Sequence, residues 1–66
     1  MKMWEKAIRN NGLMVEVWWE PDDNEFRAVV RDEEIDEGWV GTADTVNDAI
    51  LTAVAIYEKD QANAAA

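Results

Sequence analysis

The chain has 66 residues and no cysteine, a size and composition that exclude a deep catalytic cleft and a core held by disulfides. Its 48% hydrophobic content, with four tryptophans, is enough for one apolar core. A net charge of −9 excludes nucleic acid and anionic membranes as natural direct partners, because phosphates attract Lys and Arg, and it favours a basic protein surface instead.

The distribution of apolar residues bears on location and domain organisation. No apolar run approaches the roughly 20 residues of a membrane span, and the N-terminal segment lacks the continuous apolar stretch of a signal peptide. We therefore expect a cytoplasmic protein with a single acidic α+β domain over residues 1–60 and a disordered or frayed tail over residues 61–66. Like-charge repulsion between copies predicts a monomer.

Residues 1–10 have the spacing of a short amphipathic helix, with Trp4, Ala7 and Ile8 on one face. The Asn-Gly pair that ends at Gly12 is typical of a helix stop. This segment holds three of the six basic residues and one acidic residue. It is either a basic binding patch or a helix docked on its own acidic domain, and we favour the docked helix.

Two alternating segments, residues 13–20 and 25–32, predict a β-hairpin around a turn at residues 21–24. This register places Glu20 opposite Glu25, and it aligns the apolar pairs Trp19 with Phe26, Val17 with Ala28 and Val15 with Val30. One face of the hairpin is thus apolar throughout. The same register sets Trp18 opposite Arg27 and predicts a cation–π contact between them.

The next segment, residues 32–38, holds five acidic residues in seven, and their mutual repulsion predicts an exposed, extended loop. Residues 39–42 follow as a short third strand. Thr45 with Asp48 resembles a capping box and starts a second helix. The helix carries one apolar face that would cover the apolar side of the sheet, formed by Val46, Ala49, Ile50, Ala53, Val54 and Tyr57.

The order of elements predicts an α+β fold, a three-stranded antiparallel sheet with two helices (α-β-β-β-α). The first helix lies either beside the second helix or over the outer face of the sheet, and the sequence leaves this open. If the outer face is uncovered, Met14, Trp18 and Val29 form an exposed apolar patch of the kind that marks an interface.

The residue types present argue against catalysis. Histidine, cysteine and serine are all absent, which removes the usual general base, the thiolate and the serine nucleophile. A pair of carboxylates would still need a substrate cleft. The acidic loop also fails as a calcium loop, because Glu37 stands where glycine is required and Ala43 stands at position twelve. We expect no enzyme activity, no metal site and no cofactor.

Acidic residues dominate the middle of the chain. Residues 16–48 contain twelve acidic residues against Arg27 and Arg31, a net charge of −10 on a small fold. Such repulsion costs stability, so a compensating use is a reasonable inference. Carboxylates two apart on an extended segment stand about 7 Å apart, on the scale of neighbouring DNA phosphates. The candidate partner-binding residues are Glu20, Asp22, Asp23, Glu25, Asp32, Glu33, Glu34, Asp36 and Glu37, with Trp18 as an apolar anchor.

About two-thirds of the chain resembles a known family. The hairpin segments VEVWWE (15–20) and EFRAVV (25–30), followed by GTADTVNDAI (41–50), are similar to the HicB-type antitoxin domain, in which a hairpin leads to a G-x-T-x-x-E-A helix start. The resemblance implies the same order of elements. If it extends to function, it implies a small basic RNase toxin as the partner.

A second resemblance is one of type. The small size, the charge of −9 and the acidic blocks 20–25 and 32–37 are similar to those of phage-encoded anti-CRISPR proteins that imitate DNA. This resemblance implies an inhibitor in the bacterial host cytoplasm that occupies the basic nucleic-acid-binding groove of a CRISPR effector complex. We rank it above the antitoxin interpretation because it uses the acidic surface that the antitoxin interpretation leaves partly unexplained.

Overall fold

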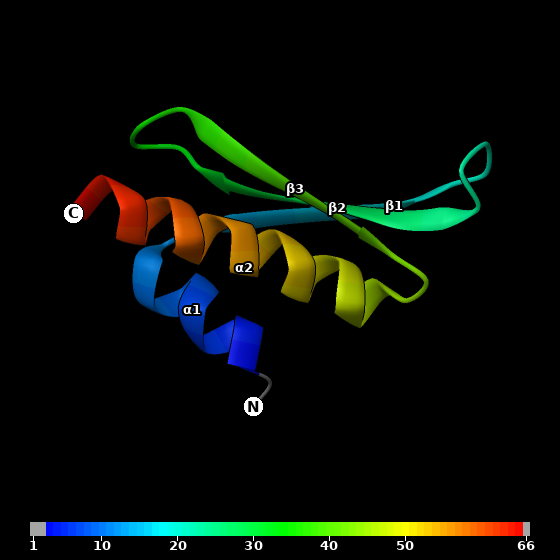
Figure 1. The fold of residues 1–66 in the computed structure, drawn as a ribbon, viewed down its shortest axis with the longest axis horizontal. Coiled ribbons are helices and arrows are strands. Elements are labelled where there is room, and N and C mark those ends of the chain that lie inside the picture. Colours follow the sequence, from blue (N-terminus) through cyan, green and yellow to red (C-terminus); the bar gives the residue numbers. More distant parts are fainter. Residues whose placement is uncertain (1–2, 66) are drawn as a thin grey trace.

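The computed structural model describes residues 3–65, which form one antiparallel sheet with two helices on the same side of it (Figure 1). The elements follow in the predicted order, and the α+β class with a three-stranded antiparallel sheet is confirmed. They are α1 (Met3–Asn11), β1 (Met14–Glu20), β2 (Glu25–Asp32), β3 (Glu37–Ala43) and α2 (Val46–Ala65).

The end of α1 is fixed by a glycine. Gly12 has a φ of 62°, in the left-handed region that glycine adopts without steric cost. This allows the backbone N–H of Leu13 to donate to the carbonyl of Ile8 at 3.0 Å, the bond of a Schellman cap. The Asn-Gly stop predicted from the sequence is therefore confirmed. The first two residues of the predicted helix lie outside the described residues.

β2 is the central strand, and its register with β1 is the predicted one. Glu20 lies opposite Glu25, and the apolar pairs are Trp19 with Phe26, Val17 with Ala28 and Val15 with Val30. The four-residue turn closes at Asn24, which adopts a φ of 54°. The register is well determined because a shift of one residue would move the whole apolar set to the other face.

The acidic segment between β2 and β3 is a tight turn, and the prediction of an extended loop is wrong. β2 continues to Asp32 and β3 begins at Glu37. Asp32 Oδ1 accepts a hydrogen bond from the backbone N–H of Glu34 at 3.1 Å, and Asp36 takes the left-handed φ of 53° that the turn needs. Local bonding between side chain and backbone outweighs the repulsion on which the prediction relied.

α2 covers the sheet through small residues. Ala49 and Ala53 are fully buried where the helix crosses Gly41 of β3. A Cβ atom at Gly41 would lie 2.3 Å from the backbone nitrogen of Ala53 and 2.6 Å from the carbonyl oxygen of Ala49, so the close approach of the helix requires glycine here. The rest of the buried core consists of Leu13, Ala28, Val30, Trp39, Ile50, Val54 and Tyr57.

The two ends of α2 differ in how well the sequence predicts them. Thr45 Oγ1 accepts a hydrogen bond from the backbone N–H of Asp48 at 3.1 Å, so the predicted cap is present. Val46, predicted on the buried face, is exposed because it stands at the helix start. Residues 61–65, predicted as a disordered or frayed tail, continue α2, because this alanine-rich segment has high helix propensity. Residue 66 lies outside the described residues.

α1 lies beside α2 on the same face of the sheet, which settles the question left open above and supports the docked helix (Figure 1). The indole N–H of Trp4 donates to Asn47 Oδ1 of α2 at 2.7 Å, and Ala7 and Ile8 pack against the core. Within residues 3–65, no element covers the outer face, where Met14 and Trp18 are exposed.

Candidate functional site

The predicted acidic residues fall into two groups at opposite ends of β2 (Figure 1). The first acidic end, at the β1–β2 turn, contains Glu20, Asp22, Asp23 and Glu25. The second acidic end, at the β2–β3 turn, contains Asp32, Glu33, Glu34, Asp36 and Glu37. At about 3.3 Å per residue, the length of β2 separates them by about 23 Å. The residues therefore form two clusters at turns and not a continuous ladder of carboxylates along one extended segment.

Each end also gathers acidic residues that the sequence analysis did not select. Ala43 pairs with Phe26, so Asp44, which follows it, emerges beside the first acidic end, and Asp48 starts α2 there. At the second end, the indole N–H of Trp39 donates to Asp60 Oδ2 at 3.1 Å. The sequence could have indicated Asp44, because in a three-stranded meander the third strand ends beside the turn that joins the first two strands.

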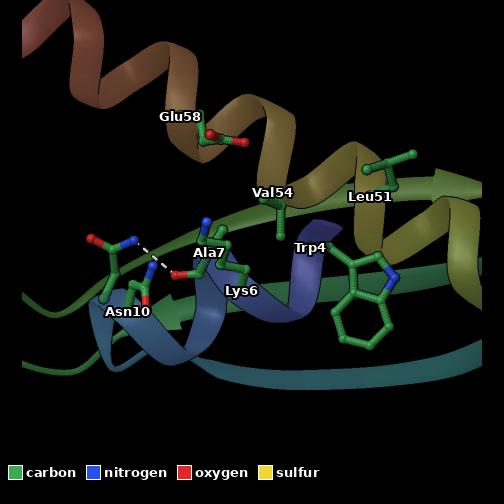
Figure 2. Close-up of a pocket in the computed structure, with 8 residues that line it drawn as sticks. Trp4, Lys6, Ala7, Asn10, Leu51, Val54 and Glu58 are labelled. Carbon is green, nitrogen blue, oxygen red and sulfur yellow. Dashed lines mark hydrogen bonds between the residues drawn. The ribbon is translucent and has the colours of Figure 1, made fainter. Parts of the chain in front are cut away.

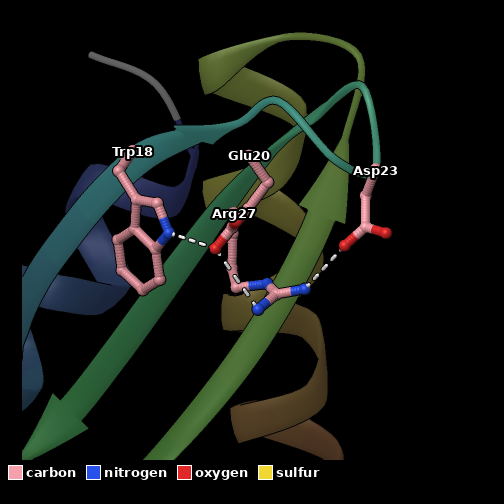
Figure 3. Close-up of polar contacts among 4 residues, drawn as sticks. All are labelled: Trp18, Glu20, Asp23 and Arg27. Carbon is pink, nitrogen blue, oxygen red and sulfur yellow. Dashed lines mark hydrogen bonds and ion pairs between the residues drawn. The ribbon is translucent and has the colours of Figure 1, made fainter.

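A polar network links Trp18 to the first acidic end (Figure 3). The indole N–H of Trp18 donates to Glu20 Oε1 at 2.6 Å, and the same oxygen lies 3.4 Å from Arg27 Nη1. Arg27 Nη2 lies 3.3 Å from Asp23 Oδ2. Trp18 and Arg27 are opposite one another as predicted, but Glu20 bridges them in place of the expected cation–π contact. The network neutralises part of this end and fixes the orientation of the indole.

The other predicted carboxylates remain available for a partner. In the part of the chain that the structure describes, six of them have no hydrogen bond or ion pair with another side chain or with the backbone: Asp22, Glu25, Glu33, Glu34, Asp36 and Glu37. All of these are exposed except Glu25, which is half-buried. The surface at both ends is thus strongly negative and largely uncompensated.

Tyr57 is a buried core residue whose hydroxyl is affected by Asp32 of the second acidic end. This side chain is buried in edge-to-face contact with Trp39, with ring centroids 4.8 Å apart. Burial raises the pKa of the Tyr57 hydroxyl above its usual value, and the charges of Asp32 and Glu58 raise it further. The Tyr57 hydroxyl is thus close enough to Asp32 and Glu58 for their charges to act on it.

A shallow groove of about 300 Å³ runs between α1 and α2 (Figure 2). Its lining is half apolar and half polar: the apolar residues are Trp4, Ala7, Leu51 and Val54, and the polar ones are Lys6, Asn10, Asn11 and Glu58. None of the predicted site residues lines it. It therefore brings together neither a pair of acidic groups nor any other set suited to acid–base chemistry.

Metal sites and membrane-spanning helices were the other possibilities for residues 3–65. Within this range, no three acidic side chains are arranged to share a metal ion, and neither helix has both the length and the apolar character needed to cross a bilayer. Comparisons with protein-family models, curated proteins and solved structures find no match to this chain. The two resemblances therefore rest on the residues that carry them.

Proposed function

We propose that the protein is a non-catalytic inhibitor that presents an acidic, DNA-mimicking surface to the basic nucleic-acid-binding groove of a CRISPR effector complex and so blocks target DNA binding. The observation that carries the proposal is the pair of exposed acidic ends, in a segment with twelve acidic and two basic residues. Like-charge repulsion of this size works against folding, and a basic groove is the surface that relieves it.

The separation of the two acidic ends can be expressed in steps of a nucleic-acid backbone. Phosphates along one DNA strand advance by about 3.4 Å, so the separation of about 23 Å between the two ends corresponds to about seven base-pair steps. The sheet fixes this separation, because both turns are anchored by β2. Long-range attraction of this kind gives fast association that weakens as salt increases.

The proposal is tested by a gel-shift assay of target double-stranded DNA with a purified CRISPR effector complex, titrated with this protein at two salt concentrations. We expect loss of DNA binding at near-equimolar protein and weaker inhibition at the higher salt, because screening shortens the reach of surface charges. DNA binding that persists at every ratio, at both salt concentrations, would refute the proposal.

Charge variants locate the effect on the surface. Glu33→Gln, Glu34→Gln and Asp36→Asn together change the net charge from −9 to −6 at the second acidic end. Glu5→Lys with Asn10→Lys makes the same change on α1, which contains neither of the two acidic turns. We expect the first variant to lose inhibition and the second to retain most of it. Equal effects would mean that net charge alone matters and that no end is a specific contact.

A second candidate function is favoured by the segment from Gly41 to Ile50, which resembles the helix start of HicB-type antitoxins. In this alternative the protein neutralises a small basic RNase toxin. It predicts tight capture of such a toxin in a pull-down and no effect on DNA binding by a CRISPR effector complex. The two assays together distinguish the two functions.

A further inference from the structure

β1 is an edge strand whose apolar side chains are exposed on both faces of the sheet. On the outer face, Met14 and Trp18 are 47% and 39% exposed. On the helix side, Val17 and Trp19 are 37% and 45% exposed. Trp18 and Trp19 are consecutive, so the strand projects one indole to each side. Both sides of this edge are therefore apolar and uncovered.

The apolar side chains of β1 on the helix side are exposed because α2 packs mainly on β3 and β2 and much less on β1. On β3, Trp39 and Gly41 are buried under the helix. On β1, the expected cover over Val17 and Trp19 is missing, and Trp19 packs edge to face with Phe26 at a centroid distance of 4.8 Å. α2 thus covers the helix-side face of β3 and leaves that of β1 largely uncovered.

Most of the usual protections of an edge strand are also missing from β1. Its pairing with β2 runs without a bulge from Met14 to Glu20, and the strand contains no lysine or proline. Glu20 is already engaged by Trp18 and Arg27, which leaves Glu16 as the free charge of the strand. The outer edge therefore offers about 20 Å of unpaired backbone hydrogen-bonding groups. Trp18 flanks this edge on one face of the sheet and Trp19 flanks it on the other, and Glu16 adds an exposed carboxylate.

We propose that β1 is a docking edge to which a protein partner adds an extended strand that carries basic side chains. The added backbone would bond to the open edge of β1, and its side chains, which alternate between the two faces, would contact Trp18 on one side and Trp19 on the other. Glu16 selects a Lys or Arg in the added strand as its cross-strand neighbour. The inference rests on the proposed function only for the positive charge of the partner.

Charge excludes a second copy of this chain as the natural occupant. Two copies would each bring a net charge of −9 to the interface, and pairing of β1 with β1 would place both Glu16 carboxylates in the same short ladder. A basic strand brings the opposite charge to the same edge.

The test uses two short peptides on the whole ¹⁵N-labelled protein. The first peptide alternates valine and lysine over seven residues, the length of β1. The second keeps the lysines but replaces each valine with proline, so it has the same charge and cannot extend a sheet. We expect the Val-Lys peptide to shift and protect amides of residues 14–20, and the Pro-Lys peptide to bind at least about tenfold more weakly.

Two variants, one on each edge strand, show which edge of the sheet binds the peptide. Val17→Lys places a charge on β1, where Val17 is 37% exposed, and Val40→Lys places the same charge on β3, the other edge strand, where Val40 is 48% exposed. We expect Val17→Lys to weaken binding of the Val-Lys peptide about three- to tenfold more than Val40→Lys does. The amide spectrum of each free variant shows whether it folds, and Met14→Lys, at a more exposed position of β1, replaces Val17→Lys if it does not.

Three results would overturn the inference: equal binding of the two peptides, amide shifts confined to the acidic turns, or a dimer in sedimentation with β1 amides protected before peptide is added. The titration needs no CRISPR effector complex. Failure of the gel-shift assay with a positive titration would refute the proposed function and leave the docking edge standing, and the reverse pair of results would do the opposite.

Discussion

Gly41 controls the distance between α2 and the sheet. A Cβ atom at this position would lie 2.3 Å from the backbone nitrogen of Ala53 and 2.6 Å from the backbone oxygen of Ala49, and backbone atoms of a packed helix cannot move aside independently. We expect Gly41→Ala to lower the free energy of unfolding by about 3 kcal/mol, a large share of the stability of a small domain. Urea denaturation followed by tryptophan fluorescence measures this loss.

Gly38 provides the matched control on the same strand. A Cβ atom there would lie 3.5 Å from Val29 Cγ1, an ordinary contact with a side chain. Gly38→Ala should leave stability unchanged or raise it slightly, because alanine restricts the unfolded chain. If the two substitutions prove equally harmless, α2 does not press on β3 as closely as the structure indicates.

At the level of elements, the hydrogen bond between Trp4 and Asn47 and a small apolar contact hold α1 to α2. Asn47 Oδ1 accepts from the indole N–H of Trp4 at 2.7 Å across the helix pair. Removal of that acceptor by Asn47→Ala should cost about 1 kcal/mol. It should also speed hydrogen exchange at the amides of α1 more than at those of β2, since docking of α1 is the contact that is weakened.

Asn63→Ala is the control for helix propensity, because it makes the same substitution at an exposed position of α2. It should leave exchange in α1 unchanged. Faster exchange across the whole chain in Asn47→Ala, with α1 and β2 affected alike, would show that α1 unfolds together with the sheet and not by undocking.

Elements also show how far the sequence predicts this molecule. The β1–β2 register was predictable because the period of two and the turn from Pro21 to Asn24 allow one alignment that makes a face apolar. The centring of α2 over β3 was not, because it depends on the small residues Gly41, Ala49 and Ala53 meeting in space, and a helical pattern shows only that a face is apolar. The exposure of Trp19 follows from that packing, so the open edge was equally hidden in the sequence.

The candidate site was predictable in composition but not in arrangement. The nine acidic residues were selected by local density, which the sequence states directly. Their division into two ends follows from strand pairing, and the neutralisation of Glu20 and Asp23 by a single arginine follows from side-chain geometry. Asp44 and Asp60 were missed because they are far from the turns along the chain and near them only in the fold.

For the whole molecule, the concentration of charge at the acidic ends should lower the free energy of unfolding. Residues 16–48 carry a net charge of −10, and within each end the carboxylates lie a few residues apart on a tight turn. Arg27 compensates two of them, and ion pairs this exposed contribute little to stability. Like-charge repulsion between the remaining carboxylates should therefore dominate the electrostatic part of the folding free energy.

Salt should accordingly stabilise this protein. An increase in NaCl from about 0.1 M to about 1 M shortens the Debye length from about 10 Å to about 3 Å, which screens the repulsion within each end. We expect the free energy of unfolding to rise by about 1 kcal/mol, measured by urea denaturation because urea, unlike guanidinium, adds no charge of its own.

The variant with Glu33→Gln, Glu34→Gln and Asp36→Asn should already be more stable at low salt and should respond less to added NaCl, since part of the repulsion has been removed. A wild-type stability that falls with salt would mean that attraction to Arg27 outweighs the repulsion. The same variant is expected to lose inhibition, so a rise in stability together with a loss of binding would identify these carboxylates as retained for the partner and not for the fold.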